Sequence, residues 1–302
     1  MRYRIEHTTR YDYAEPVARS WQLARLLPRA LPWQHLVSHA LQVDPPPDER
    51  HDVIDSFGNS VTHFSLHGAH RWLRVQMQCT VDVDDRPALP DAAEVPWEAV
   101  RDAMRSTLRS TGANTQGSVA PAVELGVARA CEPTPLVPLS DGARDFAATA
   151  FAPGRDWLTS VTGLMQAIYA GFVFDPDATT VSTSVDEILR ERRGVCQDFA
   201  HLMLACLRAH GLPARYVSGY LLTDPPPGQE RLLGADASHA WVAAYSPWHG
   251  WVEFDPTNDQ RADDRYVTLA WGGDFADVAP LRGVILGGAR QTLEVAVRVL
   301  PI

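Results

Sequence analysis

The sequence has 302 residues, of which 45% are hydrophobic, and a formal net charge of −10. This length and composition are typical of a globular protein with one large or two modest domains. The acidic balance argues against binding to the phosphate backbone of nucleic acids. The chain has no run of 18 apolar residues and no apolar segment near its basic N-terminus. We therefore expect neither a transmembrane helix nor a signal peptide, and no membrane partner.

The first 85 residues have the pattern of β-strands. Apolar and polar residues alternate from Val61 to His67 and from Leu73 to Met77, and the segment from Asp55 to Asn59 has the composition of a turn. Several short strands of this kind predict a β-sandwich. Prolines at positions 87, 90 and 96 mark a boundary. We place the N-terminal domain at residues 1–90 and the second domain at residues 91–302.

Helical patterns dominate the next part of the chain. We expect helices from Trp97 to Arg109, near residues 141–151 and near residues 155–171, whereas residues 110–140 show no clear period. Ser184 and Glu187 form a capping-box pattern that opens a further helix.

Cys196 opens the most informative helix. The pattern starts after Gly194, continues to His210 and stops at Gly211. At about 100° per residue, one face of this helix is apolar and holds Cys196, Phe199, Ala200, Met203, Cys206 and Leu207. The opposite face holds Gln197, Asp198, His201 and Arg208. A thiol at the positive end of a helix is stabilised as the thiolate, which is the nucleophilic form.

A lone cysteine on an apolar face is more often a small core residue than a nucleophile. Cys206, Cys79 and Cys131 are interpreted in this way, as core, strand and loop residues. The irregular cysteine spacing predicts no disulfide framework, which fits a reducing compartment, and we expect a cytoplasmic protein.

Metal binding is the competing chemistry. Two histidine pairs, His35 with His39 and His63 with His67, lack a third ligand in any recognised pattern. We predict no metal site and no cofactor.

His239 and Asp255 fall on a predicted β-hairpin. The segments from Ser238 to Tyr245 and from Trp251 to Phe254 are rich in β-formers and flank a turn with Pro and Gly. Pairing Tyr245 with Trp251 places His239 diagonally across from Asp255 on one face of the sheet, where their side chains can meet. Asp255 can then orient the imidazole and leave its other nitrogen for a thiol. Each residue alone is more often structural, but the three together predict thiol acyl-transfer chemistry.

Four segments carry a family pattern: Gly194 to Ala200, Gly211 to Tyr220, His239 to Trp241, and Trp251 to Thr257. They resemble the bacterial branch of the transglutaminase-like superfamily, and the dense match covers about residues 180–258. The resemblance implies a papain-like core with Cys196 as nucleophile, His239 as base and Asp255 as the residue that orients His239.

Weaker resemblance extends to both ends of the chain. Met1 to Tyr11 and Asp55 to Asn59 resemble the N-terminal region often fused to this branch, and Gly272 to Pro280 resembles its C-terminal extension. The expected fold class is α+β, an N-terminal β-sandwich followed by a papain-like core of helices packed on an antiparallel sheet.

Two function classes follow. The first is a thiol enzyme that forms an acyl-enzyme on Cys196 from a peptide or protein substrate. The acyl group then passes to water, as in a protease or amidase, or to an amine, as in a transamidase. The alternative is a catalytically silent binding module of the same fold. By its position before His239, the loop at residues 223–235 could overhang the site, and the second oxyanion donor and the oligomeric state stay open.

Overall fold

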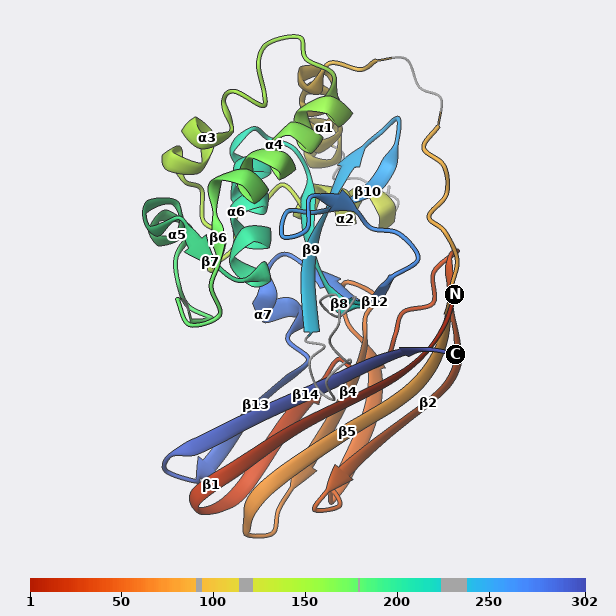
Figure 1. The fold of residues 1–302 in the computed structure, drawn as a ribbon, viewed down its shortest axis with the longest axis vertical. Coiled ribbons are helices and arrows are strands. Elements are labelled where there is room, and N and C mark those ends of the chain that lie inside the picture. The colour runs from red at the N-terminus through yellow and green to blue at the C-terminus, as the bar shows by residue number, and fades with distance from the viewer. Residues whose placement is uncertain (91–93, 114–121, 179, 224–237) are drawn as a thin grey trace, which may run out of the picture.

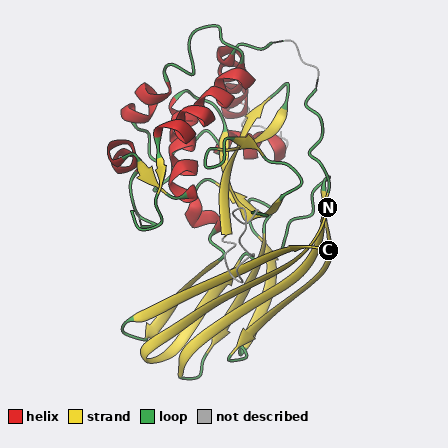
Figure 2. Ribbon diagram, in the orientation of Figure 1, coloured by secondary structure: helices red, strands yellow, loops and turns green. Residues whose placement is uncertain are grey.

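The computed structural model describes residues 1–90, 94–113, 122–178, 180–223 and 238–302. The chain folds into a β-rich part that carries both termini and a second part in which helices surround a smaller sheet (Figures 1 and 2). The α+β class and the order of the two parts confirm the prediction. Within the described ranges, no helix is both long enough and apolar enough to cross a membrane.

The β-rich part is one curled antiparallel sheet of seven strands. Its strands are β1 (Arg2–Ala24), β2 (Gln34–Asp44), β3 (Glu49–Ile54), β4 (Ser60–Leu66), β5 (His70–Val83), β13 (Leu281–Gly287) and β14 (Gln291–Pro301). The first half of β1 pairs with β5 and β14, and its second half pairs with β4 and β13. The expected β-sandwich is thus a single sheet that curls around β1, and its apolar side chains gather in one core.

The C-terminal strands correct the expected domain division. Residues 281–301 were assigned to the second domain, but they form β13 and β14, which pair only with β1. The chain therefore leaves the β-rich part once and returns to it at its C-terminal end, as Figure 1 shows. Sequence alternation in this segment gave no sign of which sheet it would join.

The second part contains a five-stranded antiparallel sheet in the order β11-β10-β9-β8-β12. Its strands are β8 (Ala214–Leu221), β9 (Ser238–Ser246), β10 (Gly250–Asp255), β11 (Gln260–Arg261) and β12 (Tyr266–Gly272), and β6 (Val173–Phe174) and β7 (Arg193–Gly194) form a separate parallel pair. The helices are α1 (Trp97–Ala113), α2 (Ala122–Arg129), α3 (Asp141–Ala147), α4 (Trp157–Gly171), α5 (Val185–Glu191), α6 (Cys196–Ala209) and α7 (Phe275–Val278). The capping box at Ser184 is present, whereas α2 lies in a segment where no period was visible.

Helix α6 is buried on both faces, which corrects the expected polar face. It packs against β8 and β9 on one side and against α3, α4 and α5 on the other. Asp198, His201 and Arg208 are each at most 3% exposed. His201 accepts a hydrogen bond from the backbone N–H of Phe275, and the Arg208 guanidinium donates to three backbone carbonyls. Backbone groups of the surrounding segments thus offset part of the cost of burying these side chains.

Buried polar contacts join the two parts of the molecule. Gln34, at the start of β2, both donates to the Thr268 carbonyl and accepts from the Thr268 N–H, each at 2.8 Å. His7 contacts the hydroxyl of Tyr220 at 2.8 Å. Apolar side chains of β8 and β12 belong to the same core as the N-terminal sheet. The β-rich part thus supports the far edge of the five-stranded sheet, so the two parts form a continuous structure.

Gly219 lies where β8 passes between β9 and β12. A Cβ at this position would overlap the backbone oxygen of Val267 and come within 2.7 Å of the Trp241 indole. Glycine is therefore required by close packing on both sides of the strand.

We expect Gly219→Ala to lower the free energy of unfolding by about 1–3 kcal/mol or more, because the backbone of β12 must move to admit the methyl group. Denaturant unfolding measures this loss. Gly68→Ala is the matched control, since a Cβ there meets nothing within 4 Å. Equal stability of the two variants would contradict the packing account.

Candidate active site

Cys196 begins α6 directly after the short strand β7. The N–H of Val195 donates to the Asp198 side chain at 2.8 Å, so this carboxylate closes the first turn of the helix. A Cβ at Gly194 would lie within 2.7 Å of the same carboxylate. Glycine at this position therefore allows the tight entry into α6 that places the thiol at the helix N-terminus.

His239 and Asp255 come from the hairpin of β9 and β10. Tyr245 pairs with Trp251, as predicted, and the register continues to Phe254 opposite Val242. The Nε2 of His239 lies 2.7 Å from Oδ2 of Asp255. The His239 side chain is 11% exposed and that of Asp255 is fully buried. The imidazole therefore reaches the edge of the sheet while its carboxylate partner stays inside.

The Asp255 carboxylate is held by several further donors. Asn258 donates its side-chain amide to Oδ2 at 2.7 Å, and the Tyr266 hydroxyl donates to the same oxygen at 2.7 Å. The backbone N–H of Thr257 donates to Oδ1 at 2.9 Å. Burial raises the pKa of Asp255, but His239, Asn258 and Tyr266 outweigh it and keep the pKa below the ordinary value. The carboxylate is thus kept ionised in a buried position.

The charge state of His239 reflects its two partners. Burial alone lowers the pKa of His239, yet hydrogen bonds with Asp255 and Cys196, together with their charges, raise it to about 10. Nε2 is occupied by the carboxylate, and Cys196 is the second group that raises the pKa of the same ring. The structure thus brings together the three residues that the sequence singled out.

Glu253 was the alternative carboxylate if the hairpin register had been shifted. Its Oε2 instead accepts two hydrogen bonds from the Arg86 guanidinium, at 3.1 and 3.2 Å, on a different part of the sheet. With this register, Asp255 and not Glu253 is the carboxylate that contacts the His239 imidazole.

Sequence reasoning placed Trp241 on the same face as the pair but missed the supporting residues Asn258 and Tyr266. Trp241 is fully buried and stacks against the His239 ring at 6.1 Å, and Tyr266 packs edge-on against Trp241. Asn258 follows the Phe-Asp-Pro-Thr segment directly, so its position in the turn was a usable signal. Tyr266 arrives from β12 across the sheet, and no local pattern pointed to it.

The other three cysteines have no comparable surroundings. Burial raises the pKa of Cys79 to about 12 and that of Cys131 to about 11, and burial also raises the pKa of Cys206. All four thiols are free. These values agree with the interpretation of the three as packing residues.

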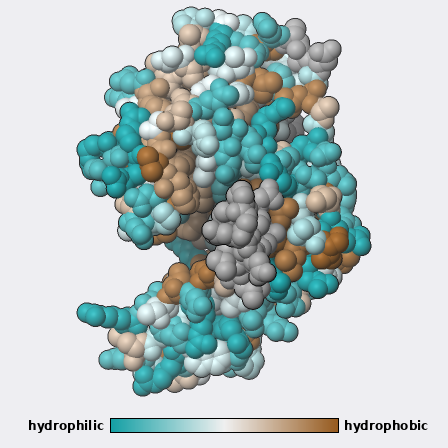
Figure 3. Space-filling view, in the orientation of Figure 1, coloured by the Kyte–Doolittle hydropathy of each residue, from teal (hydrophilic) through white to brown (hydrophobic). Residues whose placement is uncertain are grey.

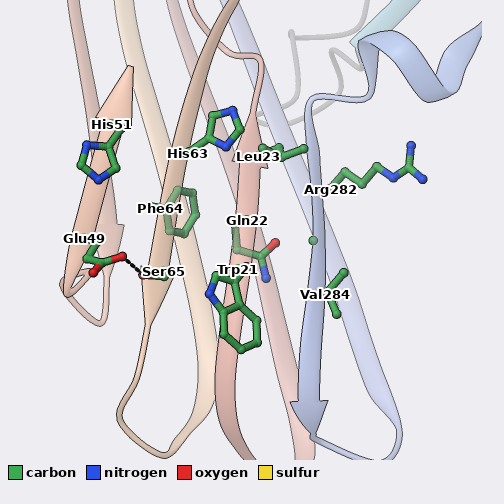
Figure 4. A pocket seen from close by; sticks show the side chains of 11 residues that line it. Trp21, Gln22, Leu23, Glu49, His51, His63, Phe64, Ser65, Arg282 and Val284 are labelled. Atoms are coloured by element: carbon green, nitrogen blue, oxygen red, sulfur yellow. Dashed lines mark hydrogen bonds between the residues drawn. The ribbon is translucent and has the colours of Figure 1, made fainter. Parts of the chain in front are cut away.

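A cavity of about 340 Å³ lies on the outer face of the N-terminal sheet, on β1, β3, β4 and β13 (Figure 4). Trp21 and Val284 form one side of it, and Glu49, His51 and His63 line the other. It contains none of the three candidate residues.

Among the residues that the structure describes, no group of three or more His, Cys, Asp or Glu side chains could hold a metal ion. The loop at residues 223–235, expected to overhang the site, lies outside the described residues after position 223.

Comparison with known families agrees with this geometry. The model of the transglutaminase-like superfamily matches residues 144–256, which include all three candidate residues. The model of the bacterial transglutaminase-like N-terminal region matches residues 3–82. The chain belongs to the transglutaminase-like superfamily. The two matched regions correspond to the helical part and the β-rich part of the fold.

Relatives of this superfamily member include proteins of similar length. An uncharacterized protein of Mycobacterium tuberculosis is 40% identical over 308 residues, which cover 99% of this chain and 93% of that protein. An uncharacterized protein of Mycobacterium leprae is 32% identical over 99% of this chain and 98% of its own length. The protein-glutamine gamma-glutamyltransferase of Pseudomonas aeruginosa is 37% identical over 116 residues, 36% of this chain and 17% of that protein.

A solved structure shares the whole fold. The crystal structure from Cytophaga hutchinsonii that carries the name "Putative Cysteine Protease" matches with a TM-score of 0.71. The match covers 99% of this chain and 90% of that chain at 21% identity. At this identity the match establishes the arrangement of the β-rich and helical parts, and nothing about the reaction.

The His239–Asp255 pair predicts a defined pH dependence. The pKa of His239 in the folded protein, about 10, lies above its ordinary value of 6.5. The pair therefore stabilises the fold fully below pH 6.5, and this contribution is lost as the pH rises through 10. We expect Asp255→Asn to move the pKa of His239 down towards 6.5, because the carboxylate charge is gone.

Titration of the His239 ring nitrogens by NMR measures this shift. Tyr266→Phe is the control, because it removes one donor to Asp255 but leaves the charge, so the pKa of His239 should stay well above 6.5. An unchanged pKa in Asp255→Asn would show that the carboxylate does not set the protonation of His239.

Proposed function

We propose that the protein is a cysteine-dependent acyl-transfer enzyme acting on a peptide or protein amide. The observation that carries the proposal is the 2.7 Å contact between the His239 imidazole and the buried Asp255 carboxylate, with Cys196 as the second group that raises the pKa of the same ring. A nucleophile, a base and a group that orients the base are the parts that acyl transfer needs. The superfamily consists in general of thiol enzymes, which supports the same class of reaction.

The first half-reaction forms a thioester on Cys196. The thiolate attacks the amide carbonyl carbon, and His239 in its imidazolium form gives its proton to the leaving nitrogen as the C–N bond breaks. The negative charge on the carbonyl oxygen develops near the N-terminus of α6. There the backbone N–H of Cys196, in the first turn of the helix, has no partner within the helix and can donate to the oxygen.

The second half-reaction transfers the acyl group to an acceptor. His239 takes a proton from the acceptor, which attacks the thioester carbonyl, and the C–S bond breaks to restore the thiolate. With water as acceptor, the product is an acid and the enzyme is a protease or amidase. With a primary amine, the product is a new amide and the enzyme is a transamidase, an outcome that the similarity to the gamma-glutamyltransferase favours. We take hydrolysis as the default, since no amine-binding site is recognisable in the sequence.

Substitution of the three residues tests the proposal. Cys196→Ala should reduce kcat/KM by about 10³-fold or more, and His239→Ala by nearly as much, because the two act as a unit. Asp255→Asn should cost less, since it disturbs the orientation and charge of the imidazole only. The readout is turnover of a peptide library followed by mass spectrometry.

Cys131→Ala is the matched control, and it should keep full activity because that thiol is remote from the imidazole. Substantial activity in Cys196→Ala would contradict the thiol mechanism. A wild-type protein that never forms an adduct on Cys196 would favour the catalytically silent binding module instead.

The acceptor is decided by competition on a preformed acyl-enzyme. The acyl-enzyme is formed with an activated ester, and a primary amine is then added at millimolar concentration. We expect the carboxylic acid to remain the main product. An amine adduct that forms much faster than the acid would overturn the preference for hydrolysis and make the protein a transglutaminase.

A further inference from the structure

Two large apolar side chains are exposed beside the segment that leads into Cys196. Phe174 is 53% exposed and Val181 is 62% exposed. Both lie in the connection between α4 and α5, which includes the short strand β6 (Figure 1). Figure 3 shows the surface hollowed between the helical part and the β-rich part below it. Backbone contacts link the two residues to Gly194 and Gln197, on either side of Cys196 in the sequence.

Phe174 is fixed next to Gly194, two residues before the nucleophile. It pairs with Gly194 in the parallel β6–β7 ladder, and the N–H of Asp175 donates to the Gly194 carbonyl at 2.9 Å. Two residues earlier, the extended Phe172 packs edge-on against Phe199 of α6 at 5.9 Å. Side chains alternate along an extended strand, so Phe174 projects to the same side as Phe172, towards the N-terminal turn of α6.

Val181 is fixed next to Gln197, the residue after the nucleophile. The Gln197 side-chain amide donates to the Val181 carbonyl at 3.3 Å. Val181 lies at the tip of a turn that is closed by the hydrogen bond from the Thr183 N–H to the Thr180 carbonyl, at 3.0 Å. The turn holds the valine side chain towards solvent. Both residues are therefore anchored, through their backbones, to residues within two positions of Cys196 in the sequence.

We propose that Phe174 and Val181 form an apolar subsite, which binds an aliphatic or aromatic side chain of the acyl donor next to the amide that Cys196 attacks. This inference rests on the proposed function and names the substrate class of the same site. Neither side chain contributes to the core clusters of the fold, so their apolar surface is available to a ligand. A peptide whose amide lies at the Cys196 thiol is then held close to the segment to which both residues are anchored.

The test compares donor peptides that differ at the residue before the scissile amide. In the wild-type protein, peptides with Leu or Phe at this position should have kcat/KM at least about 10-fold above the glycine peptide. In the Phe174→Ala/Val181→Ala double variant, this preference should fall to near unity, because the Leu and Phe peptides lose more turnover than the glycine peptide does. Ile54→Ala is the matched control, because Ile54 is at least as exposed as Phe174 and Val181 but lies on β3 of the N-terminal sheet.

Alkylation of Cys196 by iodoacetamide checks that the thiol itself is unaffected, and its rate should be the same in all variants. In the double variant, an equal loss of kcat/KM for the apolar and glycine peptides, or no loss for either, would contradict the proposed subsite.

The failure of the proposed function is distinguishable from the failure of the subsite. If no peptide is turned over, the inactivation rates with chloromethyl ketones of phenylalanine and glycine are compared. A preference for the phenylalanine reagent that disappears in the double variant supports the subsite without turnover. Equal rates with the two reagents in the wild-type protein overturn it.

Discussion

The hydrogen bond between His239 and the buried carboxylate of Asp255 is the interaction on which the site depends. A carboxylate without solvent exposure is costly unless charged and hydrogen-bonding partners compensate for it. Here an imidazole, a side-chain amide, a hydroxyl and a backbone N–H converge on its two oxygens. Removing the imidazole would leave the charge without its cation, so the same contact serves the fold and the orientation of the candidate base.

The larger architecture holds this contact in place. Tyr266 reaches Asp255 from β12, and β12 is in turn fixed to the N-terminal sheet by the two hydrogen bonds between Gln34 and Thr268. Trp241 fills the space under the His239 ring because Gly219 has no side chain. The β-rich part thus acts on the site through β12, although it supplies none of the three candidate residues. The two family models match separate regions of the chain. In the structure, hydrogen bonds between Gln34 and Thr268 join the two parts of the fold that contain these regions.

The parts that could be predicted from sequence were those with local patterns. Pairing of Tyr245 with Trp251 followed from the turn between them, and the start of α6 followed from Gly194 and its periodicity. The burial of His201 could not be predicted, because it depends on backbone donors that α7 brings from far along the chain. For the same reason, the return of residues 281–301 to the first sheet was missed, since strand pairing over this separation leaves no local signal.

The central claim is that the imidazole activates one thiol among four. The most direct measurement is the rate of iodoacetamide alkylation at each cysteine, resolved by peptide mass spectrometry between pH 5 and 9. The account predicts that Cys196 reacts first and that His239→Ala slows its alkylation, while Cys79, Cys131 and Cys206 stay unmodified in the folded protein, because burial raises the pKa of each of those three. Alkylation of Cys196 at a rate that is unchanged in His239→Ala, or that is no faster than at the other three cysteines, would contradict it.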